Sequence, residues 1–426
     1  MIRTLIAAAA LLASTTAPAK TVDVRAGRLI DPAAARVLND QRIRIVDGRI
    51  ASVGPWRDAD GAATIDWSGK TVLPGLIDLH THIADGSIDP DAANDPADPL
   101  KTTEARRILK AVPAAKTMLR AGFTTVRDVG VYRGLTDVAL RDAIDAGEFE
   151  GPRMKVAGGY ITTPGGGGDI DALSPDIPLP QSFRIGVVRN ADEARDRARY
   201  LLDHGADFIK LIATGAVLAL GSEPGALELS PEEMKAACDE ARLRGSYCIA
   251  HAHGAEGIKA AIRAGARTIE HASYLDAQGI ALAKKHGVWL DMDIYNGDWI
   301  EEVGTRQGWP AEYLRKNRET TDVQRRGFAA AVRAGAKLTF GTDAAVYPYG
   351  LGARQFAYMV RYGMTPMQAI QAATSEAARA LRMDGQVGTL APGAWGDLIA
   401  VDGDPLKDVR ALERVSAVVK GGEAVR

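Results

Sequence analysis

Hydrophobic and polar positions recur along the chain in one repeated unit. Each unit has a stretch rich in alanine and arginine with helical spacing, then a glycine, then a short apolar strand that ends in a polar residue. Glycine at this point can end a helix in a left-handed turn that most residues resist. Six units lie at residues 119–128, 202–210, 242–251, 262–271, 284–293 and 332–343, with the glycines Gly122, Gly205, Gly245, Gly265, Gly287 and Gly335.

Two further strands complete the series. Residues 73–79 and 153–157 have the same short apolar pattern, which makes eight β/α units between about residues 73 and 384. A doubly wound open sheet is the alternative, but it would more naturally carry a glycine-rich phosphate loop after its first strand. This chain has His80, Thr81 and His82 there. We therefore predict an α/β fold with a (β/α)8 TIM barrel over residues 73–384.

The two ends of the chain follow a different pattern. Residues 20–72 and 385–426 alternate short polar and apolar runs, which is typical of half-buried strands. The sequences DGR at 47–49 and SGK at 68–70 predict hairpin turns. We expect a small β-sandwich domain that is built from both termini and flanks the barrel.

Two long loops follow predicted strands one and three. Residues 85–100 are acidic and proline-rich, and residues 162–183 contain four successive glycines at 165–168. Both loops leave the strand ends where the active sites of barrels form. They are candidate lids over a site, and solvated insertions are the alternative.

Charge and composition narrow the class of protein. Lysine and arginine total 52, aspartate and glutamate total 54, and no basic run is long enough to predict a nucleic-acid partner. Residues 1–19 combine Arg3, an apolar run and the small residues Ala17 and Ala19, which is typical of a secretory signal cleaved after Ala19. We expect export to a periplasm and no membrane span after the signal is removed.

The chain has two cysteines, Cys238 and Cys248. Their spacing matches neither a CxxC motif nor a zinc knuckle, so sulfur is not expected among metal ligands. Cys238 falls in a helical pattern and Cys248 in the following strand, and such a pair can form a disulfide, but a chain of this size can fold without one. We therefore predict two buried free thiols.

Five of the seven histidines stand at predicted strand ends. The polar strand ends, in chain order, are His80 and His82, Lys210, His251 and His253, His271, and Asp343. In a barrel these ends open on one face, so the side chains should converge. Imidazole and carboxylate are good ligands for a divalent ion such as zinc, and the sequence therefore predicts a metal site. The other two histidines, His204 and His286, are expected to face solvent.

Lys210 is the unusual member of this set. A protonated lysine beside a dication is repelled and costly to bury, yet apolar residues flank it in FIKLIA. Its pKa can fall so that the amine stays neutral. Alternatively, the neutral amine can take up carbon dioxide and form a carbamate that bridges two metal ions.

The motifs PGLIDLHTH, FIKLIATGAV, HAHG, TIEH and GTDAAV, with the closing GTLAPGAWGDLIAVDGDP, resemble the amidohydrolase superfamily over essentially the whole mature chain. The stretch HAHGAEGIKAAIRAGARTIEH is similar to a branch of exported metal-dependent carboxypeptidases and Xaa-Pro dipeptidase-like enzymes. That branch includes ochratoxin-hydrolysing amidohydrolases, and imidazolonepropionase is a more distant relative. Many relatives have a histidine in the loop after strand three, where this chain has GGGG, so a substrate contact made there is missing or replaced.

This resemblance implies two divalent metal ions, most simply zinc, and a homo-oligomer. His80, His82 and Asp343 would hold one ion, His251 and His271 the other, and a carboxylated Lys210 would bridge them. Strand alternation lets both His251 and His253 face the site. The family pattern favours His251 as the ligand and His253 as a substrate contact.

We predict that the protein hydrolyses the amide bond of N-acyl amino acids or dipeptides with a free C-terminal carboxylate. Two bridged dications would make hydroxide available near neutral pH, with Asp343 as general acid and base and His253 as a second catalytic residue. The candidate substrate-binding residues are His253, Tyr160, Tyr347 and Arg354. A cyclic-amide hydrolase of the imidazolonepropionase or hydantoinase type is an alternative. A deaminase is another, although deaminases usually work with one metal and without the bridging lysine.

Overall fold

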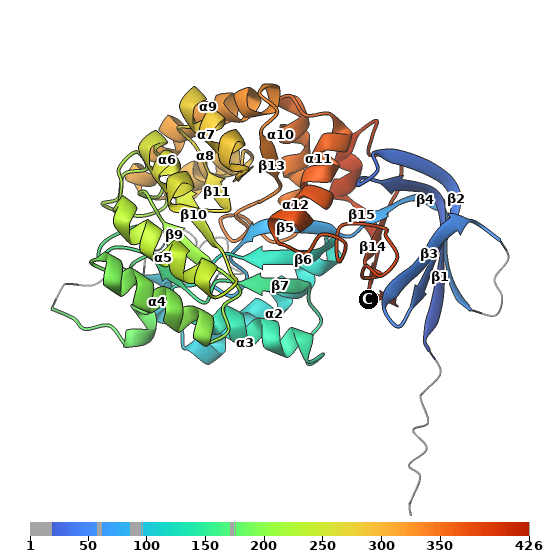
Figure 1. The fold of residues 1–426 in the computed structure, drawn as a ribbon, viewed down its shortest axis with the longest axis horizontal. Helices are drawn as coiled ribbons and strands as arrows, with labels where there is room; N and C mark the ends of the chain where they lie inside the picture. The colour runs from blue at the N-terminus through green and yellow to red at the C-terminus, as the bar shows by residue number, and fades with distance from the viewer. Residues whose placement is uncertain are drawn as a thin grey trace, which may run out of the picture.

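The computed structural model describes residues 19–57, 62–85, 95, 97–170, 174 and 176–425. The predicted signal segment lies almost wholly outside these residues, as do residues 86–94 and 96 of the first predicted lid and residues 171–173 and 175 of the second. Within the described residues, no helix is both long and apolar enough to cross a membrane. Figure 1 shows two regions: a large one in which helices surround parallel strands, and a smaller sheet to one side of it.

The smaller region joins both ends of the chain, as the alternating patterns predicted. Its strands form one continuous seven-stranded sheet with the order β16-β15-β14-β4-β1-β2-β3, rather than two separate sheets. The bounds are β1 Thr21–Asp31, β2 Arg36–Val46, β3 Arg49–Pro55, β4 Ala63–Pro74, β14 Leu398–Val401, β15 Val415–Lys420 and β16 Glu423–Ala424. Apolar side chains of β1, β2, β4 and β14 form a core that is separate from that of the large region.

Only one of the two predicted hairpin turns is present. Asp47 and Gly48 both have positive φ angles, and they connect β2 to the antiparallel β3. The predicted turn at SGK was wrong, because residues 68–70 continue inside the long strand β4. The pairing of β4 with β1 shifts register between Ala26 and Arg28, so the polar break in the pattern is a bulge rather than a turn.

The parallel strands of the large region belong to two sheets, β5-β6-β7 and β8-β9-β10-β11-β12-β13. The first sheet contains β5 Leu76–Thr81, β6 Phe123–Asp128 and β7 Arg153–Val156. The second contains β8 Tyr160–Ile161, β9 Ile209–Ile212, β10 Cys248–Ala252, β11 Thr268–His271, β12 Trp289–Asp291 and β13 Lys337–Thr339. Their short apolar sequences are almost fully buried, as expected for parallel strands covered on both faces.

The two parallel sheets meet at both of their edges. At one edge, the amide of Asp207, just before β9, donates to the carbonyl of Val156 in β7. At the other, Leu79 in β5 donates to the carbonyl of Phe340, and Asp343 donates to that of His80. This is the arrangement that the predicted barrel requires, although regular strand pairing runs over two sheets rather than one closed one.

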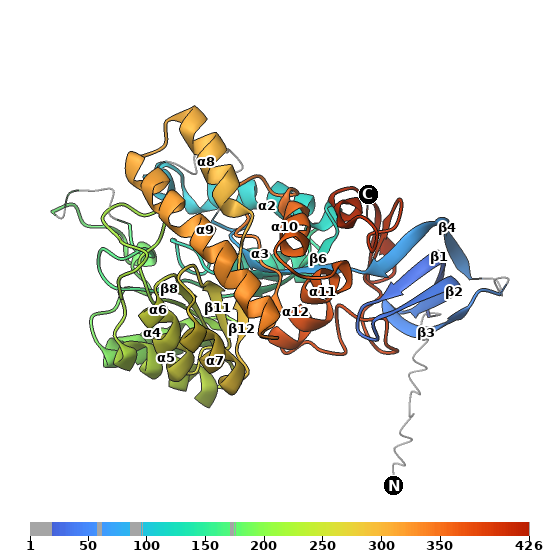
Figure 2. The ribbon, with the colours of Figure 1, turned by 90° about the horizontal axis from the view of Figure 1, so that it is seen from above.

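The helices lie around the parallel strands (Figure 2). They are α1 Asp98–Lys101, α2 Glu104–Arg120, α3 Thr136–Asp145, α4 Ala191–Asp203, α5 Pro231–Leu243, α6 Ala255–Ala264, α7 Ala277–His286, α8 Asn296–Gln307, α9 Ala311–Arg333, α10 Gln355–Arg361, α11 Pro366–Ala372 and α12 Ser375–Ala380. All six glycines of the repeated unit have positive φ angles, between +64° and +103°, as their role at helix ends predicted. His204 and His286 are exposed, as expected.

The prediction of two free thiols was wrong. Cys238 on α5 and Cys248 at the start of β10 form a disulfide, with their Cα atoms 5.2 Å apart. The connection between the end of α5 and β10 is short, so the helix lies directly against the strand that follows it. This packing, rather than any cysteine motif, brings the two sulfur atoms together.

Candidate active site

A cavity of about 310 Å³ opens where the parallel strands end. All of the polar strand ends singled out in the sequence line it, namely His80, His82, Lys210, His251, His253, His271 and Asp343. We call these seven residues the floor of the cavity. They are separated by up to 263 positions in the chain, yet the ends of parallel strands place them together, as the repeated unit predicted.

The first group of possible metal ligands consists of His80, His82 and Asp343. The Nε2 atoms of His80 and His82 lie 3.5 and 3.3 Å from Oδ1 of Asp343. Asp343 has a left-handed backbone, with φ of +58°, and its amide donates to the carbonyl of His80. A left-handed conformation is uncommon for a residue other than glycine, and tertiary contacts must hold it here.

The second group consists of His251, His253 and His271, whose ligand atoms lie within 4.8 Å of one another. Nδ1 of His253 is 2.7 Å from Oγ of Ser273, and Nδ1 of His271 is 3.0 Å from Asp293. Nε2 of His251 lies 3.2 Å from the carbonyl of Gly215. Both strand-five histidines are therefore in the group, and each keeps one ring nitrogen outside these contacts. The choice of His251 over His253 as the ligand stays a prediction.

Lys210 lies on the floor with an exposed fraction of only 1%, and its Nζ has no hydrogen-bond partner among the described residues. Burial lowers the pKa of Lys210 to about 8. Its charge in turn helps burial to hold the pKa of His80 and of His251 well below the usual range, one histidine from each group. An amine that is buried, unpaired and easily deprotonated, within electrostatic reach of both groups, fits a metal-linked role better than a structural one.

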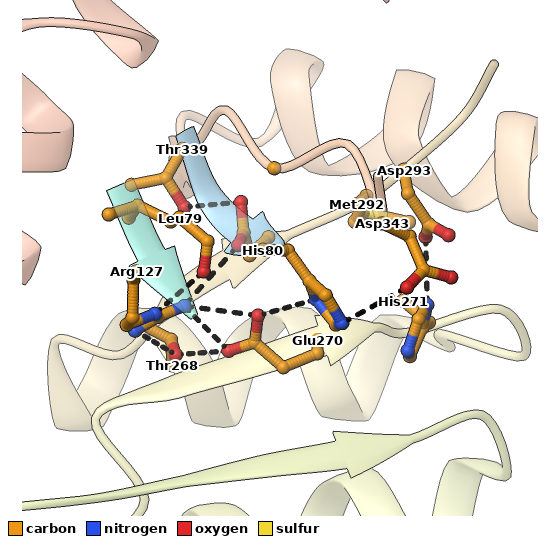
Figure 3. Close-up of polar contacts among 12 residues, drawn as sticks. Leu79, His80, Arg127, Thr268, Glu270, His271, Met292, Asp293, Thr339 and Asp343 are labelled. Atoms are coloured by element: carbon orange, nitrogen blue, oxygen red, sulfur yellow. Dashed lines mark hydrogen bonds and ion pairs between the residues drawn. The ribbon is translucent and has the colours of Figure 1, made fainter. Parts of the chain in front are cut away.

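Beneath the floor lies a buried ion layer made of Arg127, Glu270 and Asp291. Figure 3 shows Arg127 and Glu270 of this layer beside His80. Arg127 donates to both carboxylate oxygens of Glu270 at 3.0 Å and to Oδ2 of Asp291 at 3.3 Å. Oε2 of Glu270 in turn accepts from Nδ1 of His80 at 3.0 Å. With Nδ1 bonded in this way, Nε2 of His80 is the nitrogen that is left to bind a metal ion.

The backbone at β11 lets Glu270 and His271 serve the site together. In a regular strand, consecutive side chains point to opposite faces. His271 departs from the strand with φ of +66°, so Glu270 reaches the ion layer and His271 reaches the floor (Figure 3). Sequence analysis had assigned only His271 of this pair.

Two further aspartates that sequence analysis missed hold the backbone of the first group. Oδ1 of Asp78 accepts from the amides of His80 and Thr342, and Oδ2 of Asp78 accepts from the Thr342 hydroxyl, which ties β5 to the segment before Asp343. Oδ1 of Asp128 accepts from the amide of Ile83 and the hydroxyl of Thr81, next to His82. The sequence shows both aspartates as polar residues in or at the end of apolar strands. It does not show which backbone amides and hydroxyl groups they accept hydrogen bonds from.

Burial and the histidines act in opposite directions on the carboxyl group of Asp343. Burial alone would raise its pKa. The hydrogen bond from His82 and the electrostatic interactions with His80 and His271 outweigh burial, and the pKa of Asp343 lies well below its usual range. The carboxylate is therefore ionised at neutral pH, ready to bind a cation or accept a proton.

A family model described as the amidohydrolase family matches residues 71–425. The chain belongs to the amidohydrolase family. It is also 30% identical over 434 residues to ochratoxinase from Aspergillus niger, a match that covers 97% of this chain and 88% of the relative. Imidazolonepropionase from Methylobacterium sp. is more distant, at 27% identity over 396 residues, with 86% and 88% covered.

Solved structures point to the same branch. A Xaa-Pro dipeptidase with methionine bound in its active site matches with a TM-score of 0.87 and 34% identity, over 95% of this chain and 99% of that one. The structure of A. niger ochratoxinase matches with a TM-score of 0.82 and 28% identity, over 96% of each chain. The resemblance drawn from the motifs is confirmed. The protein is a hydrolase, and the family to which it belongs is metal-dependent. Its solved relatives imply a TIM barrel with a β-sandwich domain.

Of the predicted substrate contacts in this amidohydrolase, Tyr160 and His253 line the cavity. The hydroxyl of Tyr160 is 3.0 Å from Nδ1 of His82 and donates to the carbonyl of Gly130. Tyr160 therefore orients His82, and its hydroxyl is already engaged. His253 keeps its Nε2 outside the contact with Ser273.

Tyr347 and Arg354 do not belong to the described lining of the cavity, and their role as substrate contacts stays a prediction. The chain turns back after Asp343, where the amide of Val346 donates to the Asp343 carbonyl. This turn places Val346 on the cavity and Tyr347 in the core, against the ring of Tyr295. Arg354, in the short 3-10 helix Gly352–Arg354, donates to the Tyr295 hydroxyl instead.

The walls above the floor, which we call the rim, come from loops and from α8 and α9. One side is acidic and includes Asp85, Asp98 and Asp169 from the two predicted lid loops. Arg107 pairs with Asp85 and Asp98, and Arg184 pairs with Asp169. The other side is apolar, with Leu218 and Leu220 from the loop after β9, Ile300 and Val346. Sequence analysis identified the lid loops but not the loop after β9.

Proposed function

We propose that this amidohydrolase cleaves the amide bond of N-acyl amino acids or dipeptides with a free C-terminal carboxylate, using two divalent metal ions. The observation that carries this proposal is the pairing of two ligand groups with the buried, unpaired amine of Lys210. The cavity above them is of a size that suits a small substrate.

The residues present fit two metal ions. His80, His82 and Asp343 would hold one and His251 with His271 the other, and these imidazole and carboxylate donors suit zinc. Lys210 as its carbamate would bridge them, which would give the orphaned Nζ position a partner. When bound, the ions would polarise the substrate carbonyl and lower the pKa of a water molecule.

The chain's own residues would handle the protons. Asp343 is ionised and lines the cavity, so it can accept the proton of the attacking water and pass it to the leaving nitrogen. Burial holds the pKa of His253 well below its usual range, so this imidazole is neutral. When Ser273 donates to Nδ1, the proton lies on Nε2, where His253 can donate to a substrate oxygen.

The rim favours a modestly charged substrate. Lys210 is the only lysine or arginine in the described lining of the cavity, so a substrate carboxylate would rely mainly on His253. The apolar side, with Leu218 and Ile300, would take a hydrophobic side chain. This wall is consistent with a relative named ochratoxinase.

Export and assembly are part of the proposal. We propose that residues 1–19 direct the protein to the periplasm and are then removed. The disulfide between Cys238 and Cys248 supports an oxidising compartment. We also propose a homo-oligomer, which size-exclusion chromatography with light scattering would test.

A hydrolysis screen tests the proposed function. Purified, metal-loaded protein is given N-acyl amino acids and dipeptides that vary in the C-terminal residue, with release of free amino acid as the readout. Cyclic amides are included, and ammonia is assayed in parallel. We expect amino-acid release that is lost in Lys210→Ala together with bound metal, measured by elemental analysis.

A second buried lysine provides the matched control. Lys259 on α6 is 5% exposed, forms ion pairs with Glu256 and Asp276, and is not part of the described cavity lining. Lys259→Ala should keep both activity and metal. Ring opening of cyclic amides or ammonia release, without release of amino acids, would overturn the proposed substrate class.

A further inference from the structure

Asn296, the first residue of α8, lies beside Asp343 with half of its amide group unsatisfied. Its Nδ2 donates to Oδ2 of Asp293 at 2.7 Å and to Oδ2 of Asp343 at 3.0 Å. Its Oδ1 is buried and has no hydrogen-bond partner among the described residues. The residue is 6% exposed and lines the cavity.

The carboxylates of Asp293 and Asp343 determine which atom of the Asn296 amide group is nitrogen and which is oxygen. One amide atom of Asn296 lies 2.7 Å from Oδ2 of Asp293 and 3.0 Å from Oδ2 of Asp343, and carboxylate oxygens are acceptors, so this atom must be the donor Nδ2. Oδ1 therefore cannot turn toward the carboxylates, and it remains an acceptor without a donor. Buried acceptors are nearly always paired in folded proteins, so an unpaired one next to a reacting group calls for a partner that arrives with the substrate.

Other amide side chains on the cavity do not share this feature. Asn317 on α9 donates through Nδ2 to the carbonyl of Gly297, and its Oδ1 accepts from the Thr321 hydroxyl. Gln324 on α9 donates to the carbonyl of His271 and to Asp293, and its oxygen is not among the buried atoms that lack a partner. Of these three amides, only that of Asn296 has an unpaired buried oxygen, and it is the one that contacts Asp343, the proposed proton donor.

We propose that Oδ1 of Asn296 accepts a hydrogen bond from the N–H of the scissile amide, and that the enzyme therefore prefers secondary amides to tertiary ones. This inference rests on the proposed function. The nitrogen that leaves must receive a proton from Asp343, so it must lie near Asp343 and hence near Asn296. A secondary amide offers an N–H there, whereas a prolyl or N-methyl amide offers only carbon.

The selectivity follows from the cost of an unmade hydrogen bond. With a tertiary amide, Oδ1 of Asn296 stays buried, unpaired and pressed against an alkyl group. A site built to bond an N–H rejects an analogue that lacks it, and a preference of about tenfold or more in kcat/KM is expected. The preference would separate this chain from the relative that is named a Xaa-Pro dipeptidase, because a Xaa-Pro bond carries no N–H.

The test compares an N-acyl-L-alanine with the same compound methylated on the amide nitrogen, and a Xaa-Ala with a Xaa-Pro dipeptide. Wild type should favour the N–H member of each pair by about tenfold or more in kcat/KM. Asn296→Ala removes the acceptor, so the ratio should fall toward one, mainly through loss on the N–H substrate. Asn317→Ala is the matched control and should leave the ratio unchanged.

Each outcome has one meaning. Equal rates for the two members of a pair in wild type would overturn the role of Asn296 and leave the proposed function standing. An equal loss on both substrates in Asn296→Ala would also overturn it, because the residue would then only position Asp343. Hydrolysis of neither pair by wild type would overturn the proposed function itself. The wild-type ratio decides the matter even where a variant fails to fold.

Discussion

The floor of the cavity and its rim differ in how their polar side chains are held. The floor is carried by strand ends, and the ion layer of Arg127, Glu270 and Asp291 bonds it from below. The rim is carried by loops and helix ends, where Asp98 pairs with Arg107 of α2 and Leu220 is 41% exposed.

Under the proposed function, this difference separates the residues of the reaction from those of substrate recognition. A rigid, bonded floor holds its nitrogen and oxygen atoms at fixed positions, which metal binding and proton transfer require. A rim made of loops can change without disturbing the strands, so the substrate can differ between proteins that share one floor. Variants of the two regions should therefore fail in different ways.

The largest effect is expected on the floor itself. Asp343→Asn keeps the shape of the side chain and removes its charge, so the residue can no longer accept a proton. We expect kcat to fall about 10³-fold, or about 4 kcal/mol in activation free energy, with little change in KM. Steady-state kinetics on the best substrate from the screen would measure this. A loss of less than tenfold would contradict the role assigned to Asp343.

The next effect concerns the ion layer. Arg127→Met removes the cation from a fully buried cluster and leaves Glu270 without its ion-pair partner. The free energy of unfolding should fall by about 3 kcal/mol or more, as measured by urea denaturation. Arg318→Met is the control, because the Arg318–Glu301 pair is exposed and its loss should hardly change stability. Equal effects for the two variants would show that the layer does not stabilise the floor.

Asp137, a buried residue outside the described lining of the cavity, tests whether carboxyl groups away from the floor also have raised pKa values. Burial and the nearby charge of Asp128 raise the pKa of Asp137 to about 7. The folded state then binds a proton that the unfolded state releases above pH 3.8, so Asp137 reduces stability as the pH rises from about 4 to 7. Relative to wild type, Asp137→Asn should gain about 2 kcal/mol between pH 5 and 7. Urea denaturation at several pH values measures this, and a constant difference would contradict it.

The smallest effect is expected at the rim. Leu218→Ala shortens a side chain of the apolar wall. For a substrate with a hydrophobic side chain, we expect KM to rise about tenfold with kcat and stability nearly unchanged. A fall in kcat instead would show that the rim shares in the reaction, which would weaken its separation from the floor.

The fold and the floor could be predicted from the sequence because both rest on local patterns. A short apolar strand after a helix-ending glycine identifies each β/α unit, and the topology of parallel strands brings their ends to one face. His80, Lys210 and Asp343 are therefore placed together without knowledge of any contact. The repeated unit and the polar residue at the end of each strand are enough to predict that these side chains lie together.

Other features depended on the tertiary structure. The sequence shows Arg127, Glu270 and Asp291 as polar residues in apolar strands, but only packing makes them one bonded layer beneath the floor. Tyr347 turns into the core because the chain reverses after Asp343, and the two cysteines meet because α5 lies on β10. The unpaired oxygen of Asn296 exists only when Asp293 and Asp343 are both in place.

The sequence by itself determined which residues stand at the strand ends, since that needs only a period along the chain. The tertiary structure decided how those residues are bonded, oriented and left unpaired, since each hydrogen bond depends on a partner from a distant segment.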